Sequence, residues 1–115
     1  MLAEHFPTPE NLERALKLSS ESLEENPDVP GFLDTMGWIL CKRGEYAKAK
    51  TYLERAVAKS PDNPAINYHL GWCQAKLGET AKAKEALQKA LDLKPEFPDR
   101  AEARKLLESL TAGKP

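Results

Sequence analysis

The chain has few of the features that mark a disulfide-rich protein or a nucleic-acid binder. It holds two cysteines in 115 residues, too few for a disulfide framework or for a zinc site built from four thiolates. It also lacks an excess of one charge, because 17 lysines and arginines stand against 18 acidic residues. The strong basic excess of proteins that bind nucleic acid or anionic membranes is therefore missing.

Long apolar runs are missing as well. Hydrophobic residues make up 41% and charged residues 30% of the chain, and the mean hydropathy is −0.59. No stretch approaches the roughly 20 apolar residues that a membrane-spanning helix needs. The segment from Met1 to Pro7 also lacks the basic and apolar regions of a signal peptide. We therefore expect neither direct membrane insertion nor binding to nucleic acid, and one compact unit or one short array.

An internal repeat is the feature that the chain does have. Residues 37–57 read GWILCKRGEYAKAKTYLERAV, and residues 71–91 read GWCQAKLGETAKAKEALQKAL, without a gap. Matched positions are 34 residues apart, as for Gly44 and Gly78 or Pro61 and Pro95. The same offset applied backwards makes residues 9–29 the second half of an incomplete repeat. We therefore divide the chain into an N-terminal tail (1–8), this second helix (9–29), two full repeats (30–63 and 64–97) and a capping helix with a tail (98–115).

The residues that punctuate each repeat predict a pair of helices. Gly44 and Gly78 follow segments of high helix propensity, where a residue with left-handed backbone ends a helix. Pro61 and Pro95 end the second helix of each pair, because proline lacks a backbone donor and clashes with the preceding turn. Asp62 and Asn63 are candidates to cap the helix that follows. We expect helices near residues 10–25, 31–43, 46–59, 65–77, 80–93 and 99–110, and no strand.

Apolar residues at helical spacing predict the core. The first helix of each pair carries Phe32, Met36 and Ile39, or Ile66, Leu70 and Cys73. The second helix of each pair carries Ala49, Leu53, Ala56 and Val57, or Ala83, Leu87, Ala90 and Leu91. Gly37 and Gly71 are small enough to let two helix backbones approach closely.

The 34-residue period and the positions Leu70, Gly71, Ala83, Ala90 and Pro95 resemble the tetratricopeptide repeat family. The preceding repeat matches nearly as well, whereas the signature Trp and Tyr of the family are absent from both repeats. The resemblance implies an all-α fold, namely a right-handed α-solenoid of antiparallel helix hairpins with about two and a half repeats and a C-terminal capping helix.

A narrower resemblance rests on three strings, FLDTMGWIL, NYHLGW and FPDRAEARKLLESL. They are similar to the closing repeats of long bacterial tetratricopeptide proteins, among them repeat lipoproteins linked to exosortase and exopolysaccharide systems. This resemblance implies a fragment of a longer bacterial chain, either cytoplasmic or periplasmic and membrane-associated.

The family resemblance also implies a concave groove lined by the first helices, with its residues on the face opposite the core stripe. These residues are Asp34, Thr35, Trp38, Cys41 and Lys42 from one repeat and Tyr68, His69, Trp72, Ala75 and Lys76 from the next. Aromatic side chains on that face have two explanations. They contact a partner, or they pack on one another, and both can hold at once.

Neither a metal site nor a catalytic site is expected. His69 and Cys73 are spaced to share a helix face, but no third ligand stands at a suitable spacing, and Cys73 occupies the repeat position of Ile39. Cys41 would need a positioned histidine base to act as a nucleophile. We therefore expect no cofactor and no enzymatic activity.

The sequence favours a protein–protein interaction scaffold that binds a partner segment in the groove. Family members that bind the C-terminal carboxylate of heat-shock chaperones have Lys and Asn where this chain has Asp34 and Trp38, so that ligand is not expected. The alternative is a structural segment of a longer array or a self-associating one. For it, Leu12, Leu16 and Leu18 would form an apolar patch that contacts a second copy in a homo-dimer or upstream repeats, opposite a polar C-terminal end.

Overall fold

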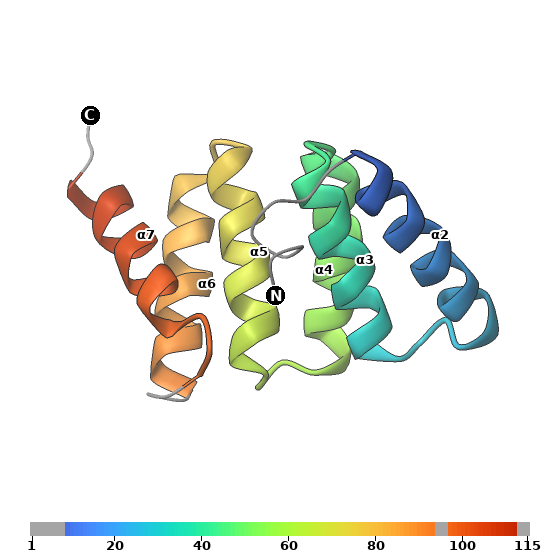
Figure 1. The fold of residues 1–115 in the computed structure, drawn as a ribbon. Coiled ribbons are helices and arrows are strands. Elements are labelled where there is room, and N and C mark those ends of the chain that lie inside the picture. The colour runs from blue at the N-terminus through green and yellow to red at the C-terminus, as the bar shows by residue number, and fades with distance from the viewer. Residues whose placement is uncertain (1–8, 94–96, 113–115) are drawn as a thin grey trace.

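Every regular element in residues 9–93 and 97–112, which the computed structural model describes, is a helix. The helices are α2 (Pro9–Glu25), α3 (Pro30–Lys42), α4 (Tyr46–Lys59), α5 (Pro64–Lys76), α6 (Thr80–Leu93) and α7 (Arg100–Ala112). Figure 1 shows them stacked in chain order, from α2 at one end to α7 at the other. The all-α prediction is confirmed, and each expected helix end lies within about two residues of the observed one.

Contacts between neighbours in the chain hold the stack together. Each helix packs against the next, and α3 also contacts α5, as α5 contacts α7. The molecule measures 40 × 28 × 26 Å along its principal axes. No helix in the described part of the chain is long and apolar enough to cross a membrane. The N-terminal tail and Pro95 lie outside the described residues.

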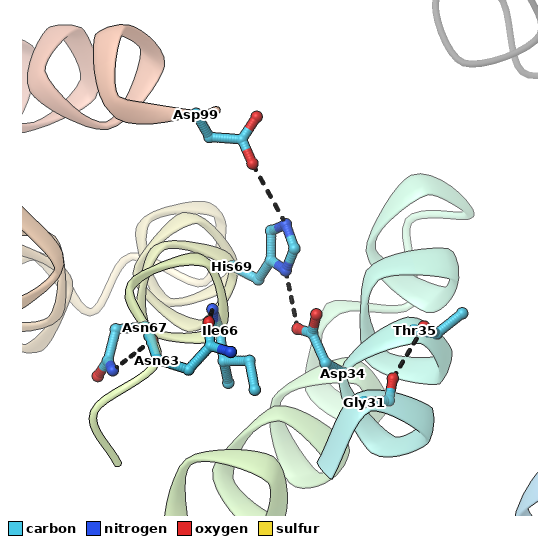
Figure 2. Close-up of polar contacts among 8 residues, drawn as sticks. All are labelled: Gly31, Asp34, Thr35, Asn63, Ile66, Asn67, His69 and Asp99. Atoms are coloured by element: carbon cyan, nitrogen blue, oxygen red, sulfur yellow. Dashed lines mark hydrogen bonds and ion pairs between the residues drawn. The ribbon is translucent and has the colours of Figure 1, made fainter. Parts of the chain in front are cut away.

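The helix ends use the expected residues. Gly44 and Gly78 have φ of +86° and +82°, and each is followed by a hydrogen bond that closes the turn, from Glu45 N–H to Leu40 and from Glu79 N–H to Gln74. This pattern satisfies carbonyl groups that would otherwise be left unpaired at a helix end. At the start of α5, the Asn63 side chain accepts a hydrogen bond from Ile66 N–H at 3.1 Å. The capping role predicted for Asn63 is confirmed (Figure 2).

Within each pair, the two helices meet at a glycine. A Cβ placed on Gly37 would lie 2.6 Å from Leu53 Cγ, and one on Gly71 would lie 2.9 Å from Leu87 Cγ. Both leucines are fully buried, so neither can move away without opening a void. The close approach predicted for these glycines is confirmed.

The core prediction was wrong for Phe32, which is half-buried, whereas its neighbour Leu33 is fully buried. The single-stripe pattern failed because α3 contacts three helices, namely α2, α4 and α5, and not one surface. Leu33 packs with Ala56 and Ile66 in a cluster that joins α3, α4 and α5. The other predicted core residues of the first helices, such as Met36, Leu70 and Cys73, are buried.

Replacing Gly71 with leucine tests the hairpin packing. The new side chain would meet Leu87 and the Ala83 carbonyl oxygen, which would lie 3.2 Å from a Cβ at this position. We expect Gly71→Leu to lower the free energy of unfolding by about 1–3 kcal/mol, measured by urea denaturation. Gly31→Ala is the matched control, because a Cβ there meets nothing within 4 Å. Equal midpoints for both variants and the parent would show that the assigned contact is absent.

Candidate functional site

The two tryptophans lie together where α3 and α5 pass each other. Trp38 and Trp72 are both partly buried, with ring centroids 5.1 Å apart and ring planes at 73°. Trp38 also stacks on His69, with centroids 4.1 Å apart and an interplanar angle of 23°. Edge-to-face and offset-stacked arrangements are the favourable ones for aromatic rings. The predicted packing of aromatic residues on one another is therefore present, and both indoles keep an exposed portion.

Two lysine ammonium groups stand over these rings. Lys42 Nζ lies 4.6 Å from the centroid of Trp38 and 5.7 Å from that of Trp72, and Lys76 Nζ lies 5.0 Å from the Trp72 centroid. Both lysines are exposed. Cation–π attraction at exposed sites contributes about 0.5–1 kcal/mol. Trp38, Trp72, Lys42 and Lys76 together form what we call the aromatic–lysine surface.

His69 of α5 contacts acidic residues in two other parts of the chain (Figure 2). Its Nδ1 lies 2.8 Å from Asp34 Oδ1 of α3, and its Nε2 lies 3.9 Å from Asp99 Oδ2, just before α7. The imidazole is nearly buried, with 11% of the side chain exposed. A buried polar ring of this kind needs hydrogen-bond partners, and Asp34 supplies one.

Two of the predicted groove residues are buried beneath the surface. Cys41 is 1% exposed and Tyr68 is 5% exposed, so neither is available to a partner, and the predictions for them were wrong. Tyr68 packs against Leu87, Ala90 and Ala103. Burial and the nearby carboxylates of Asp99 and Glu102 raise its pKa to about 12.

Thr35 faces a different part of the molecule from the aromatic–lysine surface. Its hydroxyl donates a hydrogen bond to the Gly31 carbonyl oxygen at 2.8 Å. It lines an open cleft of about 220 Å³ beside Leu18, Ser19, Ser22 and Phe32, between α2 and α3. Of the predicted groove residues, the structure thus brings together Asp34, Trp38, Lys42, Tyr68, His69, Trp72 and Lys76. Tyr68 is buried beside the rings, with its centroid 6.0 Å from that of Trp38 and 5.5 Å from that of His69. Cys41 is buried in the core, and Thr35 lies apart.

The two cysteines form a buried pair and not a reactive surface. The Cys73 thiol donates a hydrogen bond to the Tyr46 carbonyl oxygen at 3.0 Å. A hydrogen bond to Cys73 and burial together raise the pKa of Cys41 above its usual range. A thiol held in the protonated state in this way is a poor nucleophile and a poor metal ligand. The hydrogen bond with Cys41 lowers the pKa of Cys73, but that thiol is fully buried. Among the described residues, no three metal-ligating side chains come together.

Sequence reasoning missed two neighbours of the site, Tyr46 and Asp99. Tyr46 begins α4 and lies 6.1 Å from Trp72, measured between ring centroids. Asp99 reaches His69 from outside the two similar repeats. The repeat pattern could not indicate either contact. The aromatic residue Tyr46 is not repeated, because the matching position in the next repeat is Thr80, and Asp99 lies in the segment where the repeat is lost.

Comparison with protein families decides the classification. A family model described as "Tetratricopeptide repeat" matches residues 40–110, more than half of the chain. The chain belongs to the tetratricopeptide repeat family. A search of curated protein sequences found no significant match.

Solved tetratricopeptide structures share the fold. MamA (residue 41 to the end) from Desulfovibrio magneticus RS-1 is 28% identical with a TM-score of 0.78, and the match covers 88% of this chain and 55% of that one. A Thermobaculum terrenum O-GlcNAc transferase is 26% identical with a TM-score of 0.81, over 87% of this chain and 19% of that one. The first tetratricopeptide domain of Spaghetti (RPAP3), bound to an HSP90 peptide, is 18% identical with a TM-score of 0.80, over 87% and 77%. The chain thus spans about half of MamA and a fifth of the transferase.

The burial of both cysteines gives a direct chemical test. Cys41 and Cys73 are 1% and 0% exposed, so a bulky aromatic disulfide reagent should react with neither thiol in the folded protein. In guanidinium chloride both thiols should react promptly. Titration with the reagent, followed by absorbance, measures this difference. If one thiol reacts rapidly in the folded protein and this reaction is absent in Cys41→Ser, Cys41 is exposed and its assigned burial is wrong.

Proposed function

We propose that this tetratricopeptide chain is a non-catalytic interaction scaffold that binds a partner segment at the aromatic–lysine surface. The carrying observation is that Trp38 and Trp72 keep exposed portions directly beneath the ammonium groups of Lys42 and Lys76. Tryptophan provides a large apolar contact area at a low cost in conformational entropy, and such residues dominate the energy of protein interfaces. The structures of RPAP3 with an HSP90 peptide and of PcrH with a region of PopD support binding of a protein segment by this fold.

The charges of the surface favour a segment that carries carboxylates beside apolar side chains. The two lysines have no acidic partner among the ion pairs of the described residues. The Asp34 carboxylate of the site is hydrogen-bonded to His69. An HSP90-type tail is not proposed, because Asp34 and Trp38 stand where the family's chaperone-tail binders have Lys and Asn.

A catalytic role has no support from the described residues. The Cys73 thiol is directed to the Tyr46 carbonyl group, and His69 Nδ1 is bonded to Asp34 and not to a nucleophile. A nucleophilic side chain needs a base within hydrogen-bond reach. The surface offers binding groups only.

Selection from a random peptide library displayed on phage tests the binding proposal. Enriched peptides should carry acidic and apolar residues, and their affinity should be measured by isothermal titration calorimetry. We expect Lys42→Glu with Lys76→Glu, or Trp38→Ala, to weaken binding by about tenfold or more. Circular dichroism would confirm that each variant is folded.

The matched control is Lys82→Glu with Lys89→Glu, which makes the same change in net charge on exposed positions of α6. This variant should bind with nearly the parent affinity. Two results contradict the proposal: no peptide is enriched, or the enriched peptides bind all variants equally.

Self-association through α2 is a second candidate, favoured by one observation. Leu18 is 59% exposed, and it borders the open cleft between α2 and α3. Leu12 and Leu16 are half-buried, and Leu16 packs against the core, so the proposed patch is centred on Leu18. A homo-dimer through α2, or upstream repeats in a longer chain, would cover it.

Sedimentation velocity over a wide concentration range tests self-association. We expect the parent to form dimers as concentration rises and Leu18→Glu to remain monomeric, since a buried charge without a partner is costly. Lys17→Glu, an exposed neighbour on α2, is the control and should behave as the parent does. A parent that stays monomeric throughout would exclude the homo-dimer.

The narrower resemblance to repeat lipoproteins of exosortase and exopolysaccharide systems, and the bacterial location it implies, remain proposals. They rest on strings such as FLDTMGWIL and NYHLGW. The gene neighbourhood tests them, because the proposal expects genes for exopolysaccharide synthesis or export beside this one.

A further inference from the structure

His69 lies where three parts of the solenoid meet. It belongs to α5, its Nδ1 contacts Asp34 of α3, and its Nε2 faces Asp99 at the start of the segment that forms α7 (Figure 2). Asp99 also anchors α7 through its carbonyl oxygen, which accepts a hydrogen bond from Ala103 N–H at 2.9 Å. A change at His69 can therefore act on the joint between the α5–α6 hairpin and α7.

The two contacts of the imidazole differ in length. The Nδ1 to Asp34 distance is 2.8 Å, that of a good hydrogen bond, whereas the Nε2 to Asp99 distance is 3.9 Å, beyond hydrogen-bond length. A neutral imidazole has one N–H, and the short contact with a carboxylate places it on Nδ1. In that state Nε2 carries a lone pair and no hydrogen. It cannot donate a hydrogen bond to the Asp99 carboxylate, so no hydrogen bond draws the two groups closer.

Protonation strengthens the existing contact with Asp34 and creates a new donor on the Nε2 side. The ring then has a second N–H, directed at Asp99, and a positive charge between two carboxylates. Hydrogen bonds between charged groups are shorter and stronger than neutral ones. Asp99 has the freedom to close the gap, since 41% of its side chain is exposed, against 17% for Asp34.

The other charged groups near the ring lie farther out. From α3, Lys42 stands over Trp38, on which His69 stacks. From α5, Lys76 stands over Trp72, and the neutral phenol of Tyr68 lies beside the imidazole, with ring centroids 5.5 Å apart. From the α7 side, Glu102 acts on Tyr68, and Arg100 follows Asp99. Among the described residues, no acidic side chain of α4 or α6 forms an ion pair with His69.

We propose that His69 is a proton-controlled joint, in which its protonation draws Asp99 onto Nε2 and holds α7 more firmly against α5. Histidine is suited to this role, because imidazole side chains ordinarily gain and lose a proton between pH 5 and 8. This proposal does not rest on partner binding at the aromatic–lysine surface.

Amide hydrogen exchange measures the joint directly. Exchange is followed at about pH 5 and about pH 8, the two ends of the usual titration range of imidazole, and corrected for the intrinsic rates. Amides of α7 should be protected about two- to fivefold more at the lower pH, the effect expected of a partly exposed ion pair. Amides of α4, which packs mainly against α3 and α5, serve as the internal reference and should show no such change.

Two variants decide whether Asp99 and His69 cause the effect. Asp99→Asn keeps the shape of the side chain but removes its charge, and His69→Gln removes the titrating group, so each should abolish the pH dependence of α7 protection. His5→Gln, at the other histidine of the chain, should keep it. The proposal is overturned if α7 protection is equal at both pH values, or if Asp99→Asn responds to pH as the parent does. Should His69→Gln fail to fold, the exposed Asp99 variant still gives the answer.

Discussion

The close approach of two helices at Gly37 and Gly71 is the constraint on which the rest of the structure depends. A side chain at either position would collide with a fully buried leucine, Leu53 or Leu87. Each glycine is followed directly by a tryptophan, and one residue turns a helix by about 100°. Because the glycine faces the second helix of its pair, the tryptophan is turned away from it, toward the neighbouring first helix. The packing of the hairpins thus sets the position of both indoles.

The environment of the first helices explains why the site is partly buried. Helix α5 contacts α3, α4, α6 and α7, so most of its surface is covered, including the polar Asn67, His69 and Gln74. Asn67 Nδ2 donates to the carbonyl oxygens of Pro61 and Asn63 at 3.0 and 2.9 Å. Such bonds offset the cost of removing an amide from water. What remains exposed on this helix is concentrated at Trp72 and Lys76, next to Trp38 and Lys42 of α3.

Much of the fold could be predicted from the sequence, because the 34-residue repeat and its glycines and prolines carry local rules. Helix ends, the Asn63 cap and the glycine contacts all follow from such rules. The site was predictable only in part, since a rule based on one core stripe assumes one buried face. This rule placed Trp38, Trp72 and the two lysines together but took Cys41 and Tyr68 for exposed residues, whereas both are buried in core clusters against which the two tryptophans pack. The approach of Asp99 to His69 depends on tertiary packing of the non-repeated end, for which no local pattern exists.

The indole N–H signals of the two tryptophans give the most direct test of the central claim, that the exposed portions of Trp38 and Trp72 form the binding surface. A ¹H–¹⁵N spectrum of the labelled protein contains one such signal for each tryptophan, and Trp38→Phe assigns them. On addition of a peptide enriched against the protein, the account predicts that both indole signals shift, together with amides of α3 and α5. Shifts confined to α2 or to the outer positions of α4 and α6, with both indole signals unmoved, would contradict it.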